Sequence, residues 1–144
     1  MLAELEAAAR GPDSALTLID KGLMIAEETG GRFTEPYLHR LRGDTLLKRD
    51  PADPAPAENA YRTAIAIAEE QGARSYVLLA SLSLAKLYQS TARIADANAV
   101  LAPAVEGFTA TPEMPEIAEA QSLLEHLAAG GDGAIPAKDP ATKV

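Results

Sequence analysis

The chain has 144 residues and carries a net charge of −8, from 21 acidic and 13 basic side chains. A charge of this sign repels a phosphate backbone and an anionic membrane surface, so neither nucleic acid nor a membrane is an expected partner. The absence of cysteine excludes disulfides, thiolate chemistry and sulfur-ligated metals. There is no apolar run of 18 residues and no basic leader followed by an apolar core, which favours a cytoplasmic protein.

Alanine accounts for 30 residues, whereas aromatic residues make up only 4% of the chain. Alanine is the best helix former and lets helices approach one another closely. The composition therefore predicts an all-α protein with thin side-chain layers between its helices.

The first two expected helices span residues 2–10 and 14–29. Gly11-Pro12 separates them, and Asp13 or Ser14 is expected to cap the second. Gly30-Gly31 supplies the left-handed conformation that ends a helix. The inward positions expected on the second helix, at helical spacing, are Leu16, Ile19, Leu23 and Ala26.

The next two helices are expected over residues 35–49 and 55–71. Pro36 suits the first turn of one, and Asp50-Pro51 ends it because a residue before proline is pushed out of the helical region. The loop 50–56 holds three prolines and is either a stiff spacer or a feature presented to a partner. The second of these helices ends at Gly72 and buries Ala57, Tyr61, Ala64, Ile65 and Ala68.

Residues 73–90 and 93–108 predict an antiparallel helical hairpin. Its first helix carries Leu84, Ala85 and Tyr88 on one face, and its second carries Ala97, Leu101 and Ala104. A last helix over 112–129 is expected to begin at Thr111-Pro112-Glu113 and to cover the open end of the array. Residues 130–144 contain few large apolar side chains and predict a flexible tail.

The spacing of the hairpin's second helix recurs at Ala57, Tyr61 and Ala64, and again at Ala15, Ile19 and Gly22, about 40 residues apart. Together with Leu84-Ala85-x-x-Tyr88, this pattern resembles the tetratricopeptide repeat, in a divergent form without the leading tryptophan. The resemblance implies that residues 1–129 stack about six or seven helices as a short right-handed solenoid. Arrays of this kind are similar to the C-terminal regions of bacterial signalling nucleotide cyclases and regulatory NTPases.

Residues suited to catalysis or metal binding are sparse. His39 and His126 are isolated, with no second His or Cys at ligand spacing. There is no nucleophile elbow and no glycine-rich phosphate loop ahead of a helix. The sequence therefore predicts a protein that is not an enzyme and carries no cofactor or metal.

The segment 37–49 is basic in an otherwise acidic chain. In the family that the sequence resembles, the first helix of each pair lines a concave groove, which would hold Tyr37, Arg40, Asp44, Lys48, Leu82, Lys86 and Gln89. A basic groove suits an acidic peptide or a chain-terminal carboxylate. The alternative is that these side chains only balance acids on neighbouring helices.

These features favour a non-catalytic protein-interaction module. The alternative is a regulatory C-terminal part of a larger signalling enzyme, a nucleotide cyclase or an NTPase, because the pattern predicts that the chain begins inside a repeat. A third interpretation is a sensor that holds an anionic metabolite in the groove. Incompletely covered apolar faces are expected at Leu2, Leu5 and Leu16, which favour a homodimer or contact with upstream domains.

Overall fold

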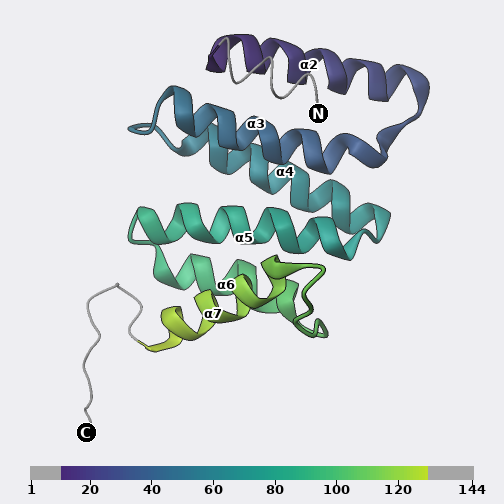
Figure 1. Cartoon of the computed structure of the whole chain (residues 1–144). Helices are drawn as coiled ribbons and strands as arrows, with labels where there is room; N and C mark the ends of the chain where they lie inside the picture. Colours follow the sequence, from purple (N-terminus) through teal and green to yellow (C-terminus); the bar gives the residue numbers. More distant parts are fainter. Residues whose placement is uncertain (1–10, 130–144) are drawn as a thin grey trace, which may run out of the picture. The chain divides into compact units, whose positions relative to one another are not determined.

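A computed structural model of the chain describes residues 11–129. These residues form six α-helices and one short 3-10 helix (Figure 1): α2 (Pro12–Thr29), η1 (Arg32–Thr34), α3 (Glu35–Arg49), α4 (Ala55–Gln71), α5 (Arg74–Ser90), α6 (Ile94–Val105) and α7 (Pro115–Ala129). Within this range the sole strand-like pairing is an isolated bridge between Thr111 and Met114. The prediction of an all-α protein is confirmed. The helix expected over 2–10 and the flexible tail expected over 130–144 lie outside the described residues.

The bounds of α3 and α4 are those predicted, because strong local signals fix them. Each helix has a proline in its first two positions, where the missing N–H has no intrahelical partner to lose. Gly30 after α2 and Gly72 after α4 both adopt the left-handed conformation, with φ of 76° and 69°. None of the described helices combines the length and apolarity needed to cross a membrane.

The expected ends of three other helices were wrong by two or three residues. Helix α2 begins at Pro12 after Gly11, whose φ is +101°, so neither Asp13 nor Ser14 precedes it as a cap. Helix α6 ends at Val105, two residues after its internal proline, rather than at 108. Helix α7 begins at Pro115 and not near 112, because Thr111 to Met114 form a separate turn in which the Met114 N–H donates to the Thr111 carbonyl.

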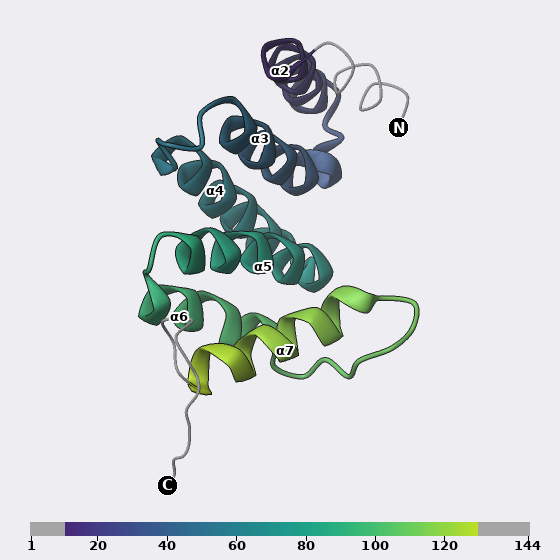
Figure 2. The same cartoon turned by 60° about the vertical axis from the view of Figure 1, so that its left-hand side comes forward.

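The chain forms two compact units, one up to Ala80 and one from Ser81, so the boundary along the sequence falls within α5. In the first unit, α3 packs against both α2 and α4, and the three helices run in alternating directions (Figures 1 and 2). In the second unit, α6 packs against α7.

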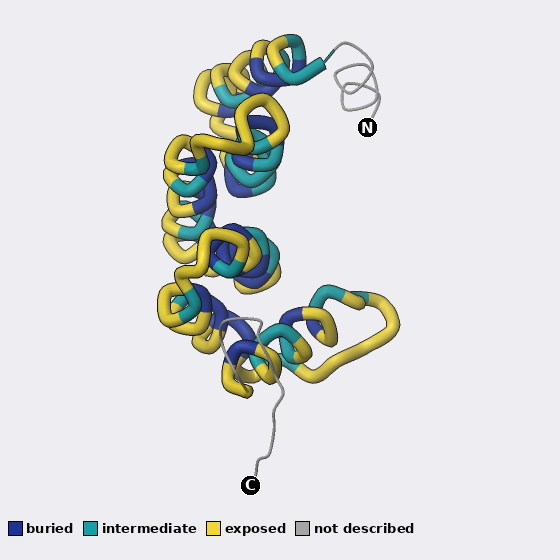
Figure 3. The backbone as a smooth tube through the Cα atoms, turned by 90° about the vertical axis from the view of Figure 1, so that its left-hand side faces the viewer, coloured by how far each residue is buried: buried dark blue, intermediate teal, exposed yellow. Residues whose placement is uncertain are grey.

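Alanines make up nearly half of the buried apolar residues in the described range, in keeping with the composition. Each helix has a buried and an exposed side (Figure 3). The four alanines expected to be buried are buried: Ala57, Ala64, Ala97 and Ala104. Leu16 is only 8% exposed, so the expectation that it lies incompletely covered was wrong; Leu2 and Leu5, named with it, lie outside the described residues.

Candidate functional site

Four of the seven residues predicted to bind a partner lie on α3 in the first unit. Tyr37, Arg40 and Asp44 are half-buried, and Lys48 is exposed. Their spacing of three or four residues places them along one side of the helix. Helix α3 is held between α2 and α4, so its position is fixed on two sides.

Asp44 is held in place by a tyrosine from the next helix. Tyr61 of α4 is only 2% exposed, and its hydroxyl donates a hydrogen bond of 2.5 Å to Asp44 Oδ1. The ring reaches this position because residue 43 is glycine; a Cβ there would lie 2.6 Å from Tyr61 Cε1. Gly43 thus allows α3 and α4 to approach closely enough for the hydrogen bond to form.

The same contact affects the protonation of the tyrosine. Burial, followed by the hydrogen bond to the Asp44 carboxylate, raises the pKa of Tyr61 above its ordinary value, and Arg40 opposes this change. Both main causes favour the neutral phenol. Tyr61 therefore acts as a fixed hydrogen-bond donor that orients Asp44.

Arg40 lies beside Tyr37, one turn earlier on α3. The guanidinium carbon is 5.8 Å from the centroid of the Tyr37 ring, within the range of a cation–π interaction. Such a contact restricts the arginine side chain without consuming its hydrogen-bond donors.

The other arginines around α3 pair with acids. Arg42 Nε lies 3.1 Å from Asp20 Oδ1, and Arg49 Nη1 lies 3.4 Å from Asp13 Oδ1, both on α2. These two residues match the alternative in which basic side chains balance neighbouring acids. Arg40 and Lys48 differ, because neither forms an ion pair with any residue in the range 11–129.

The remaining three predicted binding residues lie in the second unit and differ from the first four. Leu82 is only 4% exposed and is part of the buried core. Lys86 is exposed, but its ammonium forms an ion pair with Glu119 of α7. Gln89 is half-buried. Of the three, only Lys86 presents an exposed charged group, and that group already has a partner.

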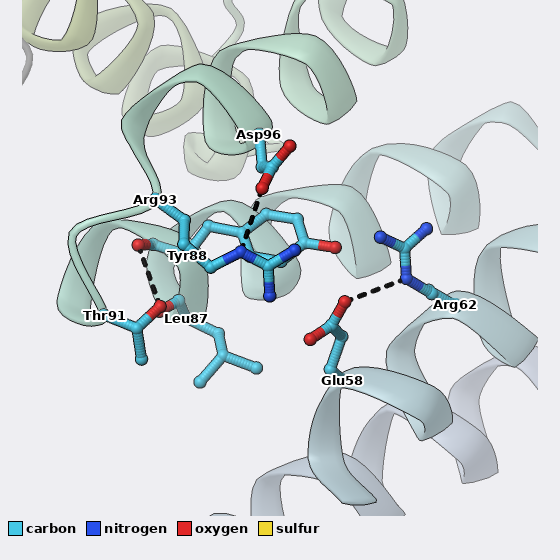
Figure 4. Close-up of polar contacts among 7 residues, drawn as sticks. All are labelled: Glu58, Arg62, Leu87, Tyr88, Thr91, Arg93 and Asp96. Carbon is cyan, nitrogen blue, oxygen red and sulfur yellow. Dashed lines mark hydrogen bonds and ion pairs between the residues drawn. The ribbon is translucent and has the colours of Figure 1, made fainter. Parts of the chain in front are cut away.

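The turn between α5 and α6 contains a second arginine–tyrosine contact (Figure 4). The Arg93 guanidinium lies 4.3 Å from the centroid of the Tyr88 ring, and its Nε is 2.9 Å from Asp96 Oδ2. The Arg93 backbone N–H also donates to the Tyr88 carbonyl. Because Tyr88 is buried and Arg93 is held at these points, this contact stabilises the turn. Figure 4 also shows an ion pair within α4, between Glu58 and Arg62.

Neither histidine is part of a metal-binding cluster. Among residues 11–129, no group of three or more His, Asp or Glu side chains is placed to hold a metal ion. His39 on α3 is half-buried, and burial lowers its pKa below the ordinary value, while Glu35 and Asp20 act against the shift and Arg42 adds to it. His126 lies exposed in the last turn of α7.

Two features of the first unit are absent from the sequence prediction. Tyr61 was recognised as part of the repeated pattern, but its contact with Gly43 was not predicted. Phe33 was assigned no role, although its side chain is 80% exposed. Its position outside the helical periodicity, between Gly31 and Thr34, is a signal that could have identified it.

Comparisons of the chain with models of protein families, with curated proteins and with solved structures found no match.

Proposed function

We propose that the chain is a non-catalytic interaction module that binds an acidic segment of a partner protein on α3. The residues that would bind it are Tyr37, Arg40, Asp44 and Lys48, which we call the α3 face. The observation that carries the proposal is the division of the basic residues: Arg42 and Arg49 pair with acids of α2, whereas Arg40 and Lys48 have no such partner among the described residues.

The surroundings of Arg40 favour a carboxylate ligand. A half-buried guanidinium is partly desolvated, so a hydrogen-bonded ion pair with it is stronger than one in open water. A charge-assisted hydrogen bond of this kind contributes about 1.5–3 kcal/mol when shielded, and much less when exposed. Contact with Tyr37 limits the conformations of Arg40 before binding, which lowers the entropic cost of ordering it.

Asp44 adds a different kind of contact to the α3 face. Tyr61 donates to one oxygen of its carboxylate, and the other can accept a hydrogen bond from a backbone N–H of the bound segment. A segment that offers carboxylates to Arg40 and Lys48 and a backbone N–H to Asp44 would satisfy all three groups.

The resemblance to tetratricopeptide repeats adds support of another kind. In that arrangement α3 would be the first helix of a pair, and its exposed side would face a concave groove. The proposal for the α3 face does not require this stacking, because it rests on contacts within the first unit. Only the resemblance suggests a binding role for the three residues of the second unit, Leu82, Lys86 and Gln89.

The test is to titrate the full chain with a glutamate-rich peptide and to measure the binding affinity by calorimetry. Binding should weaken as salt is raised, and replacement of Lys48 by Gln should weaken it by up to about fivefold, the equivalent of about 1 kcal/mol for an exposed ion pair. Arg49→Gln is the matched control, because Arg49 is the next residue and already pairs with Asp13. Equal affinities of the two variants for the peptide would contradict the proposal. Peptides with a free and an amidated C-terminus distinguish recognition of a terminal carboxylate from recognition of side chains.

A further inference from the structure

The most exposed large apolar side chains of the described residues lie close together in the sequence. They are Phe33 (80% exposed), Met24 (60%) and Ile25 (52%), within ten consecutive residues at the end of α2 and in η1. Isolated apolar residues on a surface are common, but an aromatic side chain this exposed leaves most of its ring in water. These residues identify one end of the first unit as a candidate docking surface.

The same end of the unit is acidic. Four exposed glutamates lie in the last turns of α2 and α4: Glu27, Glu28, Glu69 and Glu70. None of them forms an ion pair with another residue in the described part of the chain. The last turns of these two helices contain no basic residue, although the negative end of the helix dipole favours cations there. Glutamates at the negative ends of two helix dipoles repel those ends in the isolated unit. A cationic partner would reduce this electrostatic repulsion.

Direct contacts fix η1 to the end of α4 and to the start of α3. The Gln71 amide at the end of α4 donates a hydrogen bond of 2.8 Å to the Arg32 carbonyl, and the Arg32 guanidinium pairs with Glu35 at 3.0 Å. Phe33 therefore follows a residue whose backbone and side chain are both held. An aromatic anchor on a fixed turn loses little conformational entropy when it is covered.

We infer that this end of the first unit binds a basic amphipathic segment of another protein. Apolar residues of that segment would cover Phe33 and its apolar neighbours, and lysine or arginine residues beside them would pair with the four glutamates. Charge complementarity decides the class of partner, since anionic lipid or nucleic acid would be repelled. This surface is separate from the α3 face and has the opposite charge, so the inference does not depend on the proposed function.

The test uses the full chain and a blocked peptide of leucine and lysine with helical periodicity. Phe33→Ser should weaken binding by about tenfold while leaving the melting temperature nearly unchanged, because substitutions at exposed positions usually alter stability little. Replacement of Glu27, Glu28, Glu69 and Glu70 by Gln should weaken binding at least as much. The control is Glu113→Gln with Glu125→Gln, two exposed acids of the second unit, which should bind the peptide like the parent.

Three results would overturn the inference. If each charge removed in the control pair weakened binding as much as each charge removed in the fourfold variant, the peptide would bind through the overall charge of the chain alone. If Phe33→Ser bound the peptide as tightly as the parent chain, Phe33 would not be an apolar anchor. If light scattering showed that the parent chain self-associates and that Phe33→Ser abolishes the association, the surface would be covered by a second copy instead of a basic segment.

Discussion

The ring of Tyr61 occupies the space in which a side chain at Gly43 would have to lie. A Cβ at position 43 would be 2.6 Å from Cε1 and 2.8 Å from Cδ1 of the ring, whereas carbon atoms in contact are about 3.5–4.0 Å apart. This close approach of α3 and α4 allows the Tyr61 hydroxyl to donate a hydrogen bond to Asp44. The α3 face is thus shaped by a residue of a neighbouring helix.

Gly43→Ala should therefore destabilise the protein, although alanine is normally the better residue inside a helix. Overpacking costs about 1–3 kcal/mol, which exceeds the gain in helix propensity of about 0.5–1 kcal/mol. The matched control is Gly22→Ala on α2, whose methyl group would lie 3.5 Å from Leu38 Cδ1, an ordinary contact. Urea denaturation should show the control as stable as the parent or more so. Equal free energies of unfolding for the two variants would disprove the contact.

Stability at alkaline pH should depend on Tyr61. Because its pKa is raised in the folded state, its contribution is fully present below the unfolded tyrosine pKa of about 10 and is lost as pH rises above that value. Tyr61→Phe removes the ionisable group, so its free energy of unfolding should fall less steeply than that of the parent between about pH 9.5 and pH 11. It should also lose about 1.5–3 kcal/mol at neutral pH with the charge-assisted hydrogen bond to the Asp44 carboxylate. Parallel stability curves above pH 10 would contradict this account.

Stability at mildly acidic pH should depend on His39. Its pKa is lowered in the fold, so the folded state favours neutral imidazole, and stability declines as pH falls below the unfolded value of about 6.5. His39→Gln should make the decline shallower in the range just below that value. His126→Gln, an exposed substitution on α7, is the control. If both variants followed the parent curve, His39 would make no contribution to the acid sensitivity.

The buried alanines of the second unit give a test of packing there. Ala97 of α6 is fully buried, and Ala97→Leu should destabilise by about 1–3 kcal/mol through overpacking. Ala99 lies on the exposed side of the same helix, so Ala99→Leu should change thermal unfolding little. An unchanged melting temperature for Ala97→Leu would show that the contact around this residue can expand at no cost.

Helix type and most helix ends follow from local signals in the sequence. Proline in the first turn and left-handed glycine after the last turn act within a few residues, so the bounds of α3 and α4 were predictable. The start of α7 was not, because Pro112 and Pro115 are both acceptable first-turn residues. A hydrogen-bonded turn between Thr111 and Met114 decides in favour of Pro115.

The division of charges around α3 could not be predicted in the same way. Composition shows that the segment is basic, but pairing depends on which acids α2 brings opposite it. Asp20 and Asp13 reach Arg42 and Arg49, and neither reaches Arg40. The sequence therefore left two interpretations of the basic segment equally open. Packing supports charge balance for Arg42 and Arg49, and partner binding by Arg40 and Lys48 stays a prediction.

The central claim is tested most directly by the affinity of a glutamate-rich peptide for Arg40→Gln compared with Arg42→Gln. Glutamine is preferred to glutamate here, because a new carboxylate at 40 would lie one turn from Asp44 and repel it. Arg40→Gln should lose about tenfold in affinity at nearly parental stability. Arg42→Gln removes the ion pair with Asp20 and should lose up to about 1 kcal/mol of stability while retaining its affinity. Equal affinities of the two variants for the peptide would contradict the account.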